Sequence, residues 1–246
     1  MAFDLNKHAG EGLTDLDLAE EMPLLVLCQS GSAEIKKSHK DHAKRKVDGA
    51  EEGDIVLRSI KEVIPQPAKI IVMESKTLYV EWDEDGKLVG HHDKSVLAHP
   101  DYVEGEDEKG KFKRTLNGHD LVQTYYFGVK VEVEKEEGPE WVKAILPMSR
   151  SAVPVARIWN EYLSKLEIGG VRAPIYCAIW DLETDFSHGE DKEGNKFSWS
   201  NWMVSPEPTM LDLDQDEELL ISLSEDRKEF ALPSPKEQKA LTDDVV

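Results

Sequence analysis

Residues 120–134, DLVQTYYFGVKVEVE, impose a strict alternation on the middle of the chain. One set of alternate positions is apolar and consists of Tyr125, Phe127, Val129, Val131 and Val133. The positions between them include Tyr126, Lys130 and Glu132. Successive side chains of a β-strand point to opposite faces of its sheet, so this period of two predicts a long, half-buried strand.

Further short apolar runs, several of them rich in β-branched residues, are bounded by turn residues and also predict strands. They cover residues 23–30, 54–60, 68–75, 77–92, 140–147, 173–187 and 195–205. Residues 151–170 differ, because their apolar side chains recur three and four residues apart and Gly169-Gly170 supplies a stop. The sequence therefore predicts a mainly β chain with one core helix.

The two ends of the chain differ in composition from this β-rich region. Residues 1–22 read as an acidic N-terminal arm. Residues 205–246 contain twelve acids and four bases, the composition of a largely disordered acidic tail in which residues 219–223 could still form a short helix. We therefore expect one domain over residues 23–204, flanked by an arm and a tail.

The predicted order of elements, several strands, one helix and a final hairpin, matches that of an OB-fold-like Greek-key β-barrel. In that fold the helix lies between the third and fourth strands, and the loop after the first strand borders an oligonucleotide cleft. We therefore predict an OB-like barrel, although another small barrel or a β-sandwich with one helix would give the same order.

A basic segment, residues 36–46, follows the first predicted strand and should be a mobile loop beside that cleft. Its bases are Lys36, Lys37, Lys40, Lys44, Arg45 and Lys46, in a chain of 246 residues with a formal net charge of −20. Such a segment can bind nucleic-acid phosphates, but it is also the ordinary composition of a solvated loop. Lys130 and Lys143, on predicted strands, are two further candidate phosphate contacts.

Aromatic side chains are interleaved in the predicted strands, as expected of a surface on which bases stack. They are Trp82, Tyr125, Tyr126, Trp141, Tyr176, Trp180, Phe197, Trp199 and Trp202. Aromatic residues in short strands more often belong to the core. Tyr126, which alternates with polar neighbours, and Trp202, which follows Ser200, are the best candidates for exposed stacking surfaces.

The chain ends in TDDVV, an acidic stretch with an apolar tip formed by Asp243, Asp244, Val245 and Val246. Together with a β-rich domain and the opening MAFDLNKHAGEGLTDL, this ending resembles single-stranded DNA-binding proteins of bacteria and tailed phages. The resemblance implies a role in phage DNA replication or recombination. It also implies that the tail competes with DNA and recruits replication or recombination proteins, although the familiar tails end in an aromatic residue rather than valine.

The sequence offers little for catalysis, and we expect no enzyme, cofactor or metal site. His91, His92, Asp93 and His99 lie close together but lack metal-ligand spacing. Asp181, Glu183 and Asp185 alternate on one strand, and such a row is more often a solvent face than a cation site. Walker and GxSxG motifs are absent, and Cys28 and Cys177 lie in apolar runs where thiols are usually inert.

The absence of a signal peptide or a long apolar run predicts a protein without membrane contact, in the cytoplasm of an infected bacterial host. Two hypotheses from other classes stay open. One is a virion or assembly protein that forms a defined oligomer. The other is an acidic mimic of DNA that blocks a host enzyme. Self-association of a DNA-binding protein is also left open.

Overall fold

A computed structural model describes residues 23–107, 110, 112–190, 194, 196–229 and 232. The predictions made for the arm, residues 1–22, lie outside the described residues. The same holds for the tail tip formed by Asp243, Asp244, Val245 and Val246.

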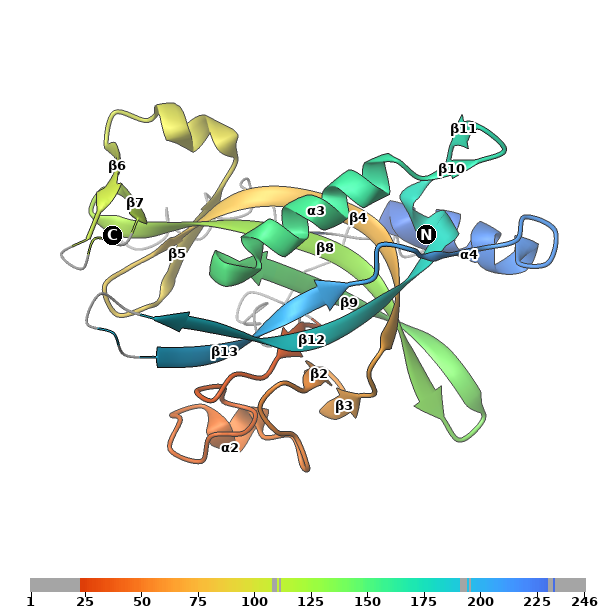
Figure 1. Ribbon diagram of the computed structural model, residues 1–246, viewed down its shortest axis with the longest axis horizontal. Coiled ribbons are helices and arrows are strands. Elements are labelled where there is room, and N and C mark those ends of the chain that lie inside the picture. Colours follow the sequence, from red (N-terminus) through yellow and green to blue (C-terminus); the bar gives the residue numbers. More distant parts are fainter. Residues whose placement is uncertain are drawn as a thin grey trace, which may run out of the picture.

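The described chain is mainly β, as predicted, and its strands pair antiparallel in open sheets (Figure 1). The longer strands, in chain order, are β4 (Ala68–Trp82), β5 (Leu88–His92), β6 (Tyr102–Glu106), β7 (Phe112–Leu116), β8 (His119–Lys135), β9 (Gly138–Ser149), β12 (Ala178–Glu190) and β13 (Lys196–Val204). The shorter strands are β1 (Leu25–Leu27), β2 (Ile55–Leu57), β3 (Glu62–Ile64), β10 (Glu167–Ile168), β11 (Val171–Arg172) and β14 (Thr209–Met210). The helical segments are α2 (His42–Arg45), α3 (Val153–Ser164), α4 (Glu217–Glu229), η1 (Lys94–Ala98), η2 (Arg150–Ala152) and η3 (Ile175–Cys177).

The large sheet runs in the order β13-β12-β4-β8-β7-β6, with β5 paired to β4, β9 to β8 and β14 to β12. Two smaller sheets, β1-β2-β3 and β10-β11, complete the pairing among the described residues. The sheets do not close on themselves, so the OB-like barrel expected from element order is not what forms. Element order could not distinguish these outcomes, because closure depends on which strands pair over long distances in the chain.

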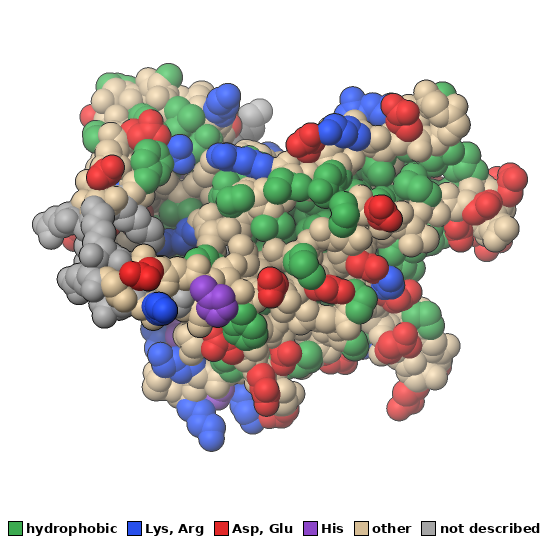
Figure 2. All heavy atoms as spheres, viewed as in Figure 1, with side chains coloured by type: hydrophobic (Ala, Val, Ile, Leu, Met, Phe, Trp, Pro, Cys, Tyr) green, Lys and Arg blue, Asp and Glu red, His purple; other side chains and the backbone are tan. Residues whose placement is uncertain are grey.

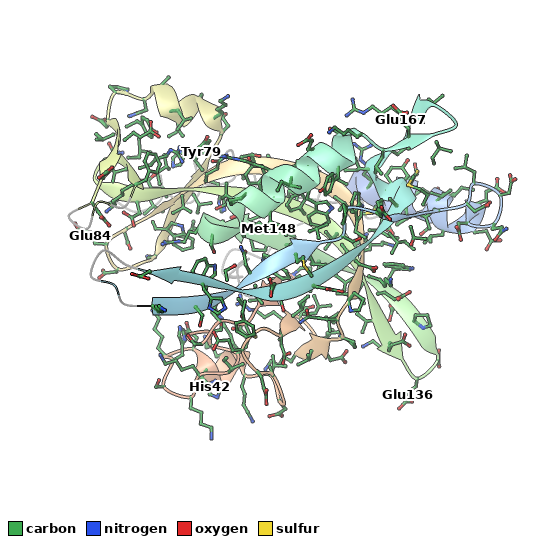
Figure 3. The ribbon with its side chains drawn as sticks, viewed as in Figure 1. His42, Tyr79, Glu84, Glu136, Met148 and Glu167 are labelled. Atoms are coloured by element: carbon green, nitrogen blue, oxygen red, sulfur yellow. The ribbon has the colours of Figure 1, made fainter. Side chains whose placement is uncertain are left out.

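The strand predicted over residues 120–134 is β8, which lies centrally between β4 and β9. Its apolar positions are buried, with Phe127 and Val129 fully so, but Tyr126 and Lys130 between them are buried as well, so the strand is covered on both faces over its middle and is not half-buried as expected. A tight turn, Asn117-Gly118, precedes it with positive φ at both residues (53° and 87°), as a two-residue hairpin turn requires. The β8–β9 hairpin projects from the body of the protein, and Glu136 lies at its outer end (Figure 3).

The helix predicted over residues 151–170 is α3, and it packs on one face of the large sheet, which we call the core face. Trp159 of α3 is fully buried, with its ring 4.6 Å from that of Phe127 and 6.1 Å from that of Trp180. The small β1-β2-β3 sheet contributes Leu25 and Ile55 to the same buried cluster. The core therefore lies between the large sheet, α3 and this small sheet.

The opposite face of the large sheet, the outer face, is covered in part by α4. Leu223 of α4 is fully buried against Ile71 and Met73 of β4. Part of the predicted tail is therefore ordered: it contains β14 and α4, and Leu211 and Leu223 give this acidic segment apolar contacts with the sheet. The short helix that the sequence left open over residues 219–223 falls inside α4.

Candidate nucleic-acid interface

The basic segment belongs to a loop that is anchored at both ends between β1 and β2. Ala33, Glu34 and Val47, which flank the segment, are buried. The Glu34 carboxylate accepts a hydrogen bond from Arg58 Nε at Oε1 (2.9 Å), and the same oxygen forms an ion pair with Arg58 Nη2 at 2.7 Å. The segment was expected to be a mobile loop because of its charge, but these buried contacts hold its ends in place.

The segment itself presents its charge to solvent. Lys36, Lys37, Lys40, Lys44 and Lys46 are exposed, and Arg45 is half-buried. Six bases and one acid, Asp41, give these eleven residues a formal charge of +5. Lys and Arg side chains gather on the surface around α2 (Figure 2), where Figure 3 labels His42. The predicted bases therefore lie on one surface of a strongly negative protein, where Lys46 is paired with the carboxylate of Asp48.

Three other predicted residues lie on the outer face of the large sheet. Lys130 of β8 lies directly opposite Lys143 of β9 in the register of the two strands. Tyr126, four residues before Lys130 on the same strand, points to the same face because side chains alternate along a strand. The structure thus pairs Lys130 with Lys143 and places Tyr126 farther along the same face, with Lys130 and Tyr126 among the buried residues.

The two lysines are paired with an acid from α4. Asp226 contacts Lys130 with one carboxylate oxygen, and its other oxygen lies 2.8 Å from Lys143 Nζ. Hydrogen bonds from both ammonium groups hold the pKa of Asp226 below its usual range. Asp226 lies in the segment predicted to be a tail, so the sequence did not show this partner. The signal for it was the spacing of Leu219, Leu223 and Asp226, which places all three toward one side of a helix.

Tyr126 is not an open stacking surface in this structure. It is 8% exposed and belongs to a buried cluster with Leu78, Val80, Ile145 and Leu232. Its hydroxyl lies 3.0 Å from His91 Nε2. Burial raises the pKa of Tyr126 to about 12.

Trp202 was expected to offer an exposed ring, but it is 7% exposed and belongs to the main core. The expectation rested on polar neighbours along β13, and one of these, Ser200, is itself only 2% exposed. Polar residues are normally exposed, but the Ser200 backbone is covered by Gln29, whose side-chain amide bonds both its N–H and its carbonyl oxygen. Trp202 is therefore a packing residue as the chain is folded here.

The histidine-rich stretch serves local structure. His92 Nε2 and His119 Nδ1 lie 2.7 Å from the two carboxylate oxygens of the buried Glu81. Asp93 accepts a hydrogen bond from the Ser95 backbone N–H and caps η1. Among the described residues no group of three or more acidic, histidine or cysteine side chains could hold a metal ion.

The carboxylates on β12 and the two thiols also have structural surroundings. Asp181 Oδ1 lies 2.5 Å from Lys69 Nζ on β4, which matches a cross-strand ion pair rather than a cation site. Both Cys28 and Cys177 are buried free thiols. Burial raises the pKa of the Cys28 thiol to about 12, and the pKa of Cys177 is also raised by burial.

An apolar groove of about 540 Å³ lies where the β10–β11 hairpin meets α4. Three exposed apolar side chains line it: Val171, Leu213 and Ile221. Apolar side chains also gather in this region of the surface in Figure 2. No pattern within one segment of the sequence indicates this groove, because its walls come from segments about fifty residues apart in the chain.

A family model described as Pam3 phage gp34-like protein matches residues 2–220. Neither the curated proteins nor the solved structures provide a match. Within the part of the chain that the structure describes, no helix is both long and apolar enough to cross a membrane.

Proposed function

Since the chain belongs to the Pam3 phage gp34-like protein family, and so is a phage protein, we propose that it binds single-stranded DNA in the cytoplasm of the infected bacterium. Its role would be in phage DNA replication or recombination. The observation that carries the proposal is the basic segment, whose six bases lie together at the surface of a chain with net charge −20.

This charge distribution supports phosphate binding at one place on the protein surface. A protein with so large a negative charge repels nucleic acid over most of its surface. A local +5 on an anchored loop then gives DNA one favourable place to bind. Each phosphate that a lysine or arginine neutralises releases condensed counterions, and this release drives binding at low salt.

The anchoring of the loop supports the same proposal. The buried Glu34 forms an ion pair with the half-buried Arg58 next to the segment, while Val47 packs with Cys28 and Val56. A loop held at both ends loses less conformational entropy on binding than a fully flexible one. The exposed lysines can still adjust to an irregular single strand, since their long side chains are in solvent.

The test is fluorescence anisotropy of a labelled oligo-dT strand with the full chain and with Lys37→Glu combined with Lys40→Glu. We expect about a tenfold loss of affinity or more, because two phosphate contacts are lost and their charges reversed. The dependence of log K on log salt should flatten by about 0.7 for each lysine that contacts a phosphate.

The matched control combines Lys87→Glu with Lys94→Glu. Both of these lysines are exposed and lie outside the basic segment, and both variants change the net charge from −20 to −24. Equal losses in the two variants would show that only overall charge matters. No binding by the unmodified chain at low salt would rule out the proposal, leaving the assembly and DNA-mimic hypotheses.

The apolar groove favours a second candidate, an assembly protein of the phage particle. Val171 is 70% exposed, and Leu213 and Ile221 are more than half exposed. Contiguous exposed apolar side chains are typical of protein–protein contacts. Sedimentation velocity tests this candidate: a defined oligomer that dissociates on Val171→Asp, in a chain that does not bind DNA, would favour assembly over DNA binding.

A further inference from the structure

The outer face of the large sheet carries a second group of basic and aromatic side chains. Lys130 and Lys143 lie opposite each other on β8 and β9, and Tyr126 and Trp141 lie along the same two strands on the same face. Trp141 is half-buried and packs beside the cluster under α4. Lysines interleaved with aromatic rings are the components of surfaces that bind single-stranded nucleic acid.

The protein's own acidic C-terminal segment covers this group. We call α4 together with Leu232 the acidic strap. It touches the outer face at three described places: Leu223 is buried against β4, Asp226 pairs with Lys130 and Lys143, and Leu232 is buried in the cluster that contains Tyr126. The Asp226 carboxylate thus lies between the ammonium groups of Lys130 and Lys143.

Few apolar side chains of α4 are buried against the sheet. Leu223 is its one fully buried residue with a described side chain, and Leu219 and Leu220 are only partly buried. Ile221 is 54% exposed on another side of the helix. Displacing α4 therefore exposes little apolar surface compared with opening the core, so the strap can open without the sheet unfolding.

We propose that the acidic strap is a displaceable cover over a second surface for single-stranded DNA, in which Lys130 and Lys143 bind phosphates and Tyr126 and Trp141 stack bases. This inference rests on the proposed function, since the strand must first bind the protein. When the strap opens, a phosphate takes the place of the Asp226 carboxylate between the two lysines. The strap then sets the affinity of the surface, because DNA must compete with an acid tethered beside it.

The first experiment compares oligo-dT binding by two full-length variants, Asp226→Asn and Glu225→Gln. Both remove one negative charge from α4, but Glu225 is exposed and lines the apolar groove instead of facing the lysines. We expect Asp226→Asn to bind about tenfold more tightly than the unmodified chain, corresponding to about 1.4 kcal/mol. Glu225→Gln should bind like the unmodified chain.

The second experiment measures hydrogen exchange of the unmodified protein with and without oligo-dT. Displacement of the strap predicts faster exchange in residues 217–229 when DNA is bound, together with slower exchange in the basic segment. Because this experiment needs no substitution, it stands even if Asp226→Asn fails to fold.

The two proposals fail in different ways. Protection of the basic segment without any change in α4 would overturn the strap and leave the proposed function intact. Equal affinities of Asp226→Asn and Glu225→Gln would also overturn it. Absence of any DNA-dependent change in exchange or anisotropy would overturn both proposals.

Discussion

Asp226 joins three elements through one carboxylate. Its two oxygens contact Lys130 and Lys143, which lie on neighbouring strands, while its backbone belongs to α4. Because Lys130 is 7% exposed, burying its charge without a charged partner would cost free energy of folding. Because Asp226 neutralises the charges of both lysines, it also determines what else can bind them. Asp226 is therefore the residue most worth testing.

Cys28 gives a prediction at the same scale. It is fully buried, and burial raises its pKa to about 12, so at pH 8 only about one thiol in ten thousand is in the reactive thiolate form. In a Cys177→Ser variant, which leaves Cys28 as the one thiol in the sequence, we expect no reaction with Ellman's reagent within minutes. The thiol should react fully in denaturing urea. Rapid reaction of the folded variant would show that the pocket around Cys28 opens readily.

At the scale of elements, α3 is the helix that completes the main core. Trp159 packs on Phe127 and near Trp180, and all three are fully buried. The indole N–H of Trp159 has no hydrogen-bond partner among the described residues, so the ring is held by packing alone. The sequence indicated α3 because a helix that packs on a sheet needs a continuous apolar stripe, which repeats every three to four residues.

Two adjacent substitutions test this packing. Trp159→Ala should lower the free energy of unfolding by about 3–5 kcal/mol, because it leaves a large cavity beneath α3. Ile158→Ala, one residue away and 50% exposed, should change it by about 0.5 kcal/mol or less. Urea denaturation measures both. Similar losses in the two variants would mean that α3 does not face the sheet through Trp159.

For the whole molecule, different elements pack on the two faces of the large sheet, and both faces carry buried residues. The core face is covered by α3 and the small β1-β2-β3 sheet, whereas α4 covers only part of the outer face (Figure 1). The basic segment adds a second asymmetry, since it concentrates positive charge at one place on an acidic protein. In both respects, the stable core is distinct from the surfaces that we propose bind single-stranded DNA.

This division predicts uneven stability. Amides of β8, which is paired on both sides along most of its length, should exchange only through global unfolding. Amides of α4 should exchange through a smaller opening with a lower free energy. Native-state hydrogen exchange in increasing urea distinguishes the two, and equal free energies for α4 and β8 would show that the helix is an integral part of the fold.

The sequence by itself determined the features that depend on neighbouring residues. The period of two in residues 120–134 predicted β8, the spacing of apolar residues predicted α3, and composition alone located the basic segment. These signals are local, because strand and helix geometry fix which side chains share a face. They also placed Tyr126 and Lys130 on one side of a strand, where the structure has them.

Only the tertiary structure decided what covers each face. Trp202 and Tyr126 both alternate with polar residues, yet Trp202 lies in the main core and Tyr126 lies in a buried cluster with Leu232. Likewise, element order suggested a barrel, but β4 pairs with β12 more than one hundred residues away and the sheet stays open. Burial and closure depend on contacts between distant segments, and a pattern within one segment carries no information about which distant segment will pack against it.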